Sequence, residues 1–261
     1  MDLSPFLLSL RIAALSTLTA LVIGVPAAWQ VTRTRGSLRT LLDTLLSLPM
    51  VLPPTVAGLV LVVLLGRNGP YPLLLGRPGA SLLFTATAAV IAATVVSFPL
   101  LYRAVRGAFE QVDVRLLWCA RSLGASELRV FLRVACPTAL PGIAGGVALA
   151  FARSLGEFGA TFMVSGSIPG KTLTVPVAIF QAVEAGHPEE AAMWSGLLLM
   201  ASWIVMSLVR LGDGRSRGRL FRRRRSSPEL PAAAPTSGSS ERRTAVPDST
   251  HRRSQEDPAW P

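Results

Sequence analysis

Long uncharged stretches recur along the chain, and short clusters of arginine separate them. Five stretches have 19 to 25 residues without Asp, Glu, Lys or Arg: 12–32, 44–66, 78–102, 134–152 and 191–209. An α-helix needs ~20 mostly apolar residues to cross the hydrocarbon core of a bilayer. Five such stretches leave too little amphipathic helix to surround them as the core of a soluble protein. The pattern therefore predicts an all-α membrane protein with five transmembrane helices.

Prolines and glycines interrupt two parts of this pattern. The second stretch contains Pro49, Pro53 and Pro54, which remove backbone donors and predict a kink or break of the kind that lines a pathway. Two further apolar stretches, 158–170 and 172–183, are too short to cross and contain several glycines and prolines. We expect them to be re-entrant segments that pack within the protein on its outer side.

The distribution of charge predicts the orientation in the membrane. Arginines cluster at 33–39, at 103–133 and at 210–225, which follow the first, third and fifth stretches. The segment after the fourth stretch is acidic instead, with Glu157, Glu184, Glu189 and Glu190. Because basic loops remain in the cytoplasm, the N-terminus is expected outside and the C-terminus inside.

Composition supports the membrane assignment and separates a tail. The chain has 261 residues, 50% hydrophobic and 16% charged, with a mean hydropathy of +0.47, which argues against a soluble enzyme. Its net charge is +11, and residues 210–261 contribute 12 basic and 6 acidic side chains. Residues 212–261 contain few large apolar side chains, so we expect a disordered cytoplasmic tail after a membrane domain of residues 1–211. The Arg222–Arg225 cluster favours membrane lipid over nucleic acid as its contact.

The 103–133 segment is the one substantial cytoplasmic loop of the membrane domain. Apolar residues recur at helical spacing over 116–123 and again over 128–135, which predicts helix, turn, helix. Gly124 suits a left-handed residue that ends the first helix, and Ser126 suits the cap of the second. A DNA-binding helix-turn-helix needs a third helix and its own core, for which the loop has no room. We therefore interpret it as a docking element for a cytoplasmic partner.

The loop resembles the docking loop of binding-protein-dependent ABC importer permeases. That signature is Glu-Ala-Ala, three residues, glycine, nine residues, then Ile-x-Leu-Pro, and here Trp118-Cys119-Ala120, Gly124 and Val134-Ala135-Cys136-Pro137 have both spacings. Leu117 or Trp118 stands in place of the usual glutamate, and Cys119 replaces the first alanine. The resemblance implies that the following residues couple the chain to an ATPase: Leu117, Cys119, Ala120, Gly124, Ala125, Ser126 and Pro137.

Other segments resemble the molybdate branch of that family. They are Leu48–Pro54, Ser97–Leu100, Phe151–Thr161, Ile168–Gly170 and Thr172–Pro176. Sulfate and thiosulfate permeases share part of the third segment, which is typical of oxyanion importers in general. The last two segments look more like molybdate or tungstate transporters.

The resemblance implies the permease subunit of a molybdate importer in the cytoplasmic (inner) membrane. Its expected partners are a second copy of the chain, a dimer of cytoplasmic ABC ATPase subunits and an extracytoplasmic molybdate-binding protein. This chain is expected to bind no cofactor, with ATP and Mg²⁺ on the ATPase. Residues 166–172 resemble a nucleotide-binding loop but are one residue short and follow no strand. The alternatives are a sulfate, thiosulfate or tungstate permease, a secondary anion carrier, or a membrane anchor without transport activity.

A gate or anion pathway is expected near the outer end of the fourth stretch. Arg153 and Glu157 are four residues apart, so they share a face if the helix continues, and pairing would then lower the cost of placing them near lipid. A structural pair is favoured over direct contact of Arg153 with the anion. Neutral donors suit a pathway that must release a dianion. The candidate pathway or gate residues are Pro53, Pro54, Thr55, Ser97, Arg153, Ser154, Glu157 and Thr161.

Overall fold

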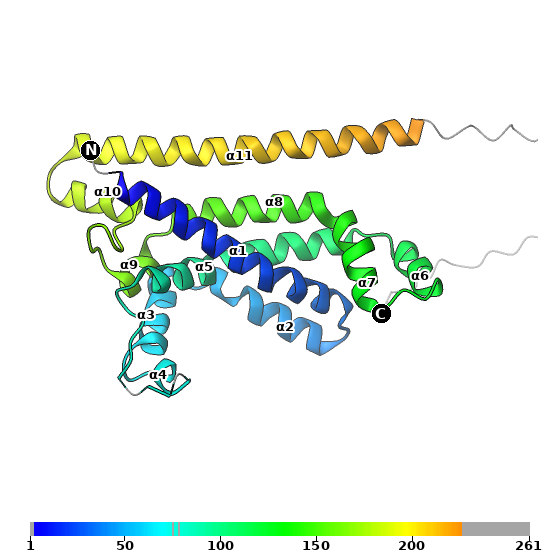
Figure 1. The fold of residues 1–261 in the computed structure, drawn as a ribbon, viewed down its shortest axis with the longest axis horizontal. Helices are drawn as coiled ribbons and strands as arrows, with labels where there is room; N and C mark the ends of the chain where they lie inside the picture. The colour runs from blue at the N-terminus through cyan, green and yellow to red at the C-terminus, as the bar shows by residue number, and fades with distance from the viewer. Residues whose placement is uncertain (1–2, 75, 78, 226–261) are drawn as a thin grey trace, which may run out of the picture.

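The computed structural model describes residues 3–74, 76–77 and 79–225, with side chains described as far as Ser207. Every regular element in this part of the chain is helical, which confirms the predicted all-α fold (Figure 1). The α-helices are α1 Ser4–Arg33, α2 Ser37–Ser47, α3 Pro54–Leu65, α4 Pro70–Leu74, α5 Ala86–Glu110, α6 Val114–Ser122, α7 Glu127–Val130, α8 Cys136–Leu155, α9 Gly159–Ser165, α10 Val175–Glu184 and α11 Pro188–Arg225. A 3₁₀ turn, Leu48–Met50, follows α2, and a π-helical segment, Phe131–Ala135, joins α7 to α8.

Helices α1, α5 and α8 pack together at the centre of the bundle. Small residues make this close approach possible. They are expected at helix contacts in a membrane, because association there depends on close packing and not on the hydrophobic effect. A Cβ atom at Gly142 of α8 would lie 2.4 Å from the Ala108 Cβ of α5, and one at Gly146 would lie 3.0 Å from the Ala104 Cβ. The glycines of α8 therefore fix its distance from α5.

Within the described part of the chain, four helices are long and apolar enough to cross a membrane singly: Ser4–Arg33, Ala86–Glu110, Glu127–Leu155 and Pro188–Ser207. The predicted second span is not a straight helix. The pair Ser37–Met50 and Pro54–Leu65 bends by 102° at the break between them. Pro53 is extended, with ψ 139°, and Pro54 begins α3, so the prolines produce the predicted break.

Several helices extend beyond the uncharged stretches that predicted them. Helix α5 continues to Glu110, and α7, the π-helical segment and α8 form one run of helix into the docking loop. Helix α11 continues to Arg225, past the predicted domain boundary at 211. Arginine and leucine are good helix formers, which suits this extension. The remainder of the predicted tail, 226–261, lies outside the described residues.

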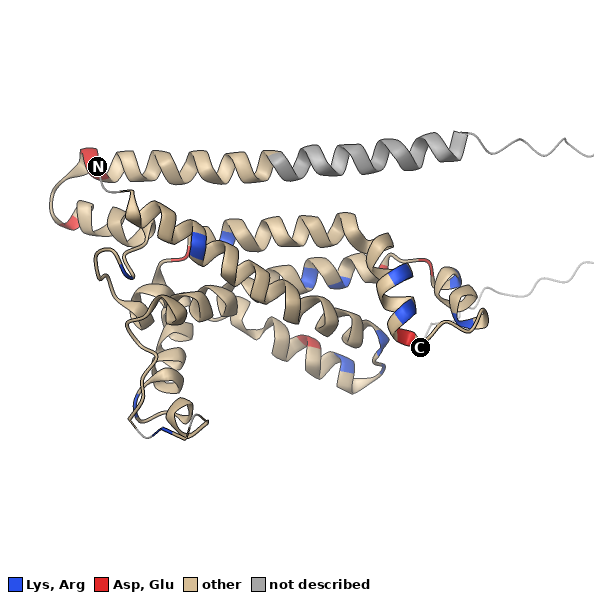
Figure 2. Cartoon of the chain, in the orientation of Figure 1, with Lys and Arg blue, Asp and Glu red and all other residues tan. Residues whose placement is uncertain are grey.

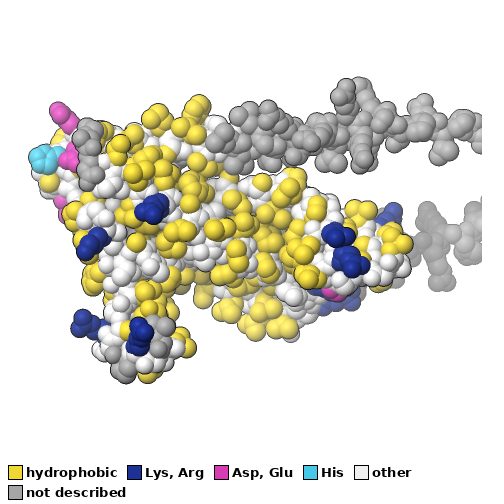
Figure 3. All heavy atoms as spheres, viewed as in Figure 1, with side chains coloured by type: hydrophobic (Ala, Val, Ile, Leu, Met, Phe, Trp, Pro, Cys, Tyr) yellow, Lys and Arg dark blue, Asp and Glu magenta, His cyan; other side chains and the backbone are white. Residues whose placement is uncertain are grey.

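The bundle has two chemically different ends. The N-terminus, α9, α10 and the start of α11 lie at one end, called here the α9–α10 end, and α6 and α7 lie at the opposite, α6–α7 end. Figure 2 shows basic residues gathered at the α6–α7 end and acidic residues at the start of α11. On the face seen in Figure 3, hydrophobic side chains cover most of the surface between the ends. This distribution is expected for a helical bundle surrounded by lipid.

Candidate functional site

The turn between α6 and α7, called here the docking turn after the role predicted for it, closes α6 with a hydrogen-bonded glycine cap. Gly124 has φ +79°, in the left-handed region, which confirms the predicted conformation. Its N–H donates to the Arg121 carbonyl at 2.9 Å, and the Ala125 N–H donates to the Ala120 carbonyl at 3.1 Å. This pair of bonds is the Schellman motif, in which a glycine lets the chain turn back over the last carbonyls of a helix. Ser126 occupies the N-cap position of α7, although its hydroxyl makes no capping hydrogen bond.

The two faces of α6 have different surroundings. Leu117 packs inward against the core of the bundle. Trp118 is 63% exposed, Leu123 is 88% exposed and Cys119 is also exposed. Of the two residues predicted to replace the glutamate of the docking-loop signature, Trp118 is therefore the one that faces outward. Exposed large apolar side chains at the end of the bundle are typical of a surface that a protein partner covers.

An ion-pair network ties the docking turn to α1. At the start of α7, Glu127 Oε2 lies 2.9 Å from Arg33 Nη2, and Glu127 Oε1 lies 2.9 Å from Arg121 Nε. The Arg33 guanidinium also lies over the Trp29 ring, 5.3 Å from its centroid. Glu127 thus joins the last turn of α1 to α6 and α7. Sequence reasoning missed this contact.

Aromatic side chains form a second junction beside the ion pairs. The Trp29 ring centroid lies 5.4 Å from that of Phe109 on α5 and 5.5 Å from that of Phe131. Phe131 begins the π-helical segment. Pro137 follows two residues after that segment ends, where its ring would crowd the Arg133 carbonyl of a regular α-helix. The wider π turn accommodates the proline that the sequence singled out.

At the α9–α10 end, the predicted pair between Arg153 and Glu157 is confirmed. Arg153 Nη1 lies 2.6 Å from Glu157 Oε2. Glu157 is only 3% exposed, and its Oε1 accepts a hydrogen bond from the Ala160 N–H at 3.0 Å. One carboxylate therefore binds both the end of α8 and the first turn of α9, which fixes the corner between them.

A small polar cavity lies inside this corner. Ser154 and Thr161, both predicted from the sequence, line it together with Glu157, Ser9 and Thr174. The sequence did not lead us to predict Ser9 and Thr174. The feature that could have identified them is that each is a small polar residue in an otherwise apolar segment. The structure thus brings together three of the predicted gate residues and adds a contribution from α1 and from the residue before α10.

The other predicted pathway residues lie elsewhere. Pro53, Pro54 and Thr55 are exposed at the start of α3, where a Cβ atom at Gly159 would lie 3.1 Å from the Pro54 Cβ. This close contact places the α3 break against the first residue of α9. Ser97 is fully buried within α5, and its hydroxyl donates to the Thr94 carbonyl at 3.4 Å.

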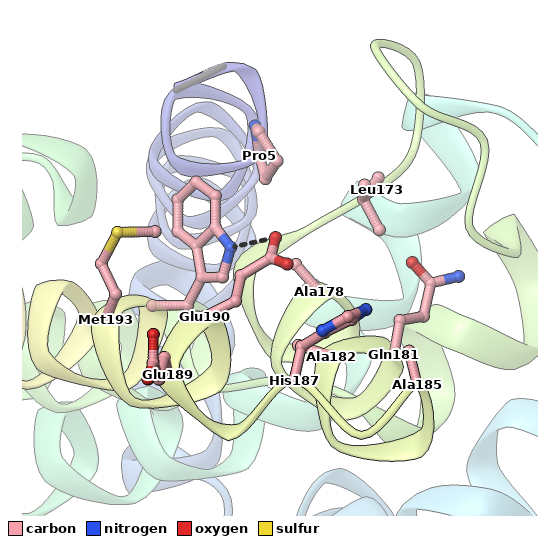
Figure 4. Close-up of a pocket in the computed structure, with 11 residues that line it drawn as sticks. Pro5, Leu173, Ala178, Gln181, Ala182, Ala185, His187, Glu189, Glu190 and Met193 are labelled. Carbon is pink, nitrogen blue, oxygen red and sulfur yellow. Dashed lines mark hydrogen bonds between the residues drawn. The ribbon is translucent and has the colours of Figure 1, made fainter.

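A groove of about 810 Å³ opens at the α9–α10 end between α1, α10 and α11 (Figure 4). Apolar side chains from all three helices form its floor. His187, Glu189 and Glu190 line it with polar groups, and Glu190 Oε1 accepts a hydrogen bond of 3.4 Å from Trp194 Nε1. The groove is therefore acidic and partly apolar.

Comparison with known proteins identifies relatives over most of the chain. Residues 20–214 match the family described as binding-protein-dependent transport system inner membrane component. The chain is 42% identical over 208 residues to the molybdenum transport system permease protein ModB of Escherichia coli (strain K12), covering 78% of this chain and 89% of that protein. It is 40% identical over 212 residues to the protein of the same name from Haemophilus influenzae, covering 81% and 91%.

A solved structure has a similar fold. It is an inward-facing conformation of the MetNI methionine ABC transporter, with a TM-score of 0.66 and 16% sequence identity. The match covers 81% of this chain and 94% of the chain in that structure. At this identity the similarity concerns the fold alone.

Proposed function

The chain belongs to the family of binding-protein-dependent transport system inner membrane components, and from this we propose that it is the permease subunit of an ATP-driven importer of molybdate. The observation that carries the proposal is the identity of 40–42% to two molybdenum permeases over about four-fifths of the chain. Sulfate, thiosulfate and tungstate permeases remain the alternatives that a transport assay must exclude. A secondary anion carrier is disfavoured by the family assignment.

We propose that the α6–α7 end faces the cytoplasm and carries the ATPase. The arginines that follow the first and third uncharged stretches support this orientation: Arg33, Arg35, Arg39, Arg103, Arg106, Arg115, Arg121, Arg129 and Arg133. The exposed face of α6, with Trp118, Cys119 and Leu123, supplies the docking surface. ATP and Mg²⁺ belong to that partner, and this chain contributes the mechanical connection.

The contacts of the docking turn indicate how movement reaches the membrane helices. Displacement of α6 and α7 acts on α1 through the Glu127–Arg33 pair and on α5 through the Phe131–Phe109 side of the aromatic junction. Helix α8 follows because it continues from α7 without a loop. A push by the ATPase would therefore move three packed helices as one body, as rigid-body switching requires.

We propose that the anion crosses between two copies of the chain. The polar cavity at the α8–α9 corner has a volume of about 10 Å³ and so is far too small for a tetrahedral oxyanion. The exposed α3 break offers the Thr55 hydroxyl and lies against α9, so it suits a gate at a dimer interface. In this arrangement Arg153 and Glu157 hold the gate in shape without contacting the anion.

The acidic groove at the α9–α10 end is the surface we propose for the binding protein. Glu189 and Glu190 complement a lysine or arginine side chain, and the apolar floor accepts its methylene stem. Association at this point would depend on salt concentration, because rim charges act mainly on the rate of encounter.

Uptake of labelled molybdate by vesicles that contain the complete importer tests the proposed substrate. We expect uptake to require ATP inside the vesicles and loaded binding protein outside. A hundredfold excess of unlabelled molybdate should abolish the signal, whereas the same excess of sulfate should leave it nearly unchanged. Equal competition by sulfate would refute molybdate selectivity, and uptake without the ATPase subunit would refute the importer assignment.

A further inference from the structure

Three buried hydroxyl groups at the α8–α9 corner have no hydrogen-bond partner among the described residues. They are Ser154 Oγ at the end of α8, Thr161 Oγ1 on α9 and Thr174 Oγ1 just before α10. Their residues are at most 5% exposed, and all three line the same small cavity. We propose that this cavity binds one ordered water molecule, which joins α8, α9 and α10 through these hydroxyls.

The size and chemistry of the cavity select water. Its volume of about 10 Å³ is close to the ~10–15 Å³ that one water needs. Buried waters typically make about three hydrogen bonds to groups that would otherwise be unsatisfied. The cavity offers three such hydroxyls, each of which is costly to leave unpaired away from solvent.

The charges around the cavity disfavour an ion. Glu157, which also lines it, is already paired with Arg153 and bonded to the Ala160 N–H, so the corner has no uncompensated negative charge for a cation. An anion would meet the Glu157 carboxylate at close range. A neutral ligand avoids both penalties, which are large for buried charges in a membrane protein.

The water would complete a junction that the protein forms only in part. Ser9 of α1 lines the same cavity, and its Oγ accepts a hydrogen bond of 2.8 Å from the Val175 N–H of α10. This direct bond joins α1 to α10, and Glu157 joins α8 to α9. The water would connect these two halves. This inference concerns the chain itself and does not depend on the transported substrate.

The direction in which the Tm changes when one hydroxyl is removed distinguishes a site that holds water from one with unpaired hydroxyls. Thr161→Val, made in the purified importer complex, preserves side-chain shape and removes one hydroxyl. If the water is bound, it loses a partner, and we expect the Tm to fall by about 2–4 °C. If no water is bound, the substitution removes an unpaired buried hydroxyl, and the Tm should rise, which would overturn the proposal.

Matched variants control for the substitution itself. Thr17→Val makes the same change at a buried residue of α1 whose hydroxyl already donates to the Ala13 carbonyl at 2.7 Å, so a smaller shift is expected. Thr161→Ser keeps the hydroxyl and should retain more of the wild-type Tm than Thr161→Val. In the double variant Thr161→Val, Thr174→Val, a shared water predicts a shift smaller than the sum of the single shifts, and strict additivity counts against it.

Two further measurements identify the occupant. A high-resolution density map of the complex should contain one solvent peak within about 3.2 Å of all three hydroxyl oxygens. Rotation of these hydroxyls onto helix carbonyls, without a peak, would overturn the proposal. Replacement of sodium by choline should leave the Tm unchanged, whereas a Tm that rises with sodium concentration would assign the site to a cation instead.

Discussion

Replacement of Gly124 by valine tests the docking turn, because the residue is exposed and its backbone conformation is special. A Cβ atom at Gly124 would meet no atom of the described residues within 4 Å, so the cost expected within the permease comes from the backbone. The left-handed conformation, φ +79° here, costs an L-residue roughly 1–2 kcal/mol, and a β-branched side chain lies at the upper end. A cost of this size reduces the ratio of the native turn to relaxed alternatives by about 5–30-fold.

The assay is the stimulation of ATP hydrolysis by loaded binding protein in reconstituted vesicles. We expect Gly124→Val to reach the membrane normally, since insertion depends on the long apolar helices, and to lose most of the stimulation. Gly124→Asn is the matched control, because asparagine tolerates the left-handed region better than other non-glycine residues. Gly124→Asn should retain a clearly larger share of the stimulated ATP hydrolysis than Gly124→Val.

Two results would contradict this reasoning. A wild-type response in Gly124→Val would show that the turn is not part of the connection between ATPase and membrane helices. Equal loss in the valine and asparagine variants would show that bulk at the partner surface, and not backbone strain, is what the glycine prevents.

Three other substitutions probe separate contacts. Gly142→Ala forces a Cβ to within 2.4 Å of a side-chain atom of α5 and should destabilise the bundle by about 1–3 kcal/mol in thermal unfolding, whereas Gly145→Ala, whose Cβ has no described atom within 4 Å, should not. Arg153→Leu leaves the buried Glu157 without its cation and should cost about 3 kcal/mol, which additional replacement of Glu157 by Gln should largely restore, because the amide is neutral and keeps an acceptor for the Ala160 N–H. Trp118→Ala should weaken copurification of the ATPase by about 30-fold, and unchanged binding would exclude this residue from the docking surface.

The sequence predicts those parts of the fold that follow from the order of apolar, charged and proline residues along the chain. Uncharged length locates α1, α5, α8 and α11, because crossing a bilayer sets a minimum apolar length. The three prolines predict that the second stretch breaks. The 102° angle of that break depends on the packing of α3 against α9, and residue spacing does not contain this information.

The site shows the same division between local and distant contacts. The Arg153–Glu157 pair and the Gly124 cap join residues close in sequence, and both were predicted, although α8 ends at Leu155, so the pair forms across the end of the helix and not on one continuing helix face. The Arg33–Glu127 pair joins residues far apart in the sequence, and neither has a local feature that names its partner. Likewise, Ser9 meets the Val175 N–H only because α1 and α10 lie side by side at one end of the bundle.

The π-helical segment joins α7 to α8, so the number of residues in this run of helix affects the direction in which α7 and the docking turn point relative to α8. A π turn contains one residue more than the α turn it replaces, and each residue of an α-helix advances the direction of its side chain by about 100°. The angle at which α7, and with it the docking turn, leaves the membrane helix is therefore set in steps of a single residue. Because the π turn takes up its extra residue within one turn, deleting one residue from 131–135 would restore an α turn and leave the exposed face of α6 close to its present direction. Deleting one residue from the regular helix of α8 would instead rotate that face by about 100° around the helix axis. Compatibility with a given ATPase thus depends on register as well as on the residues at the contact.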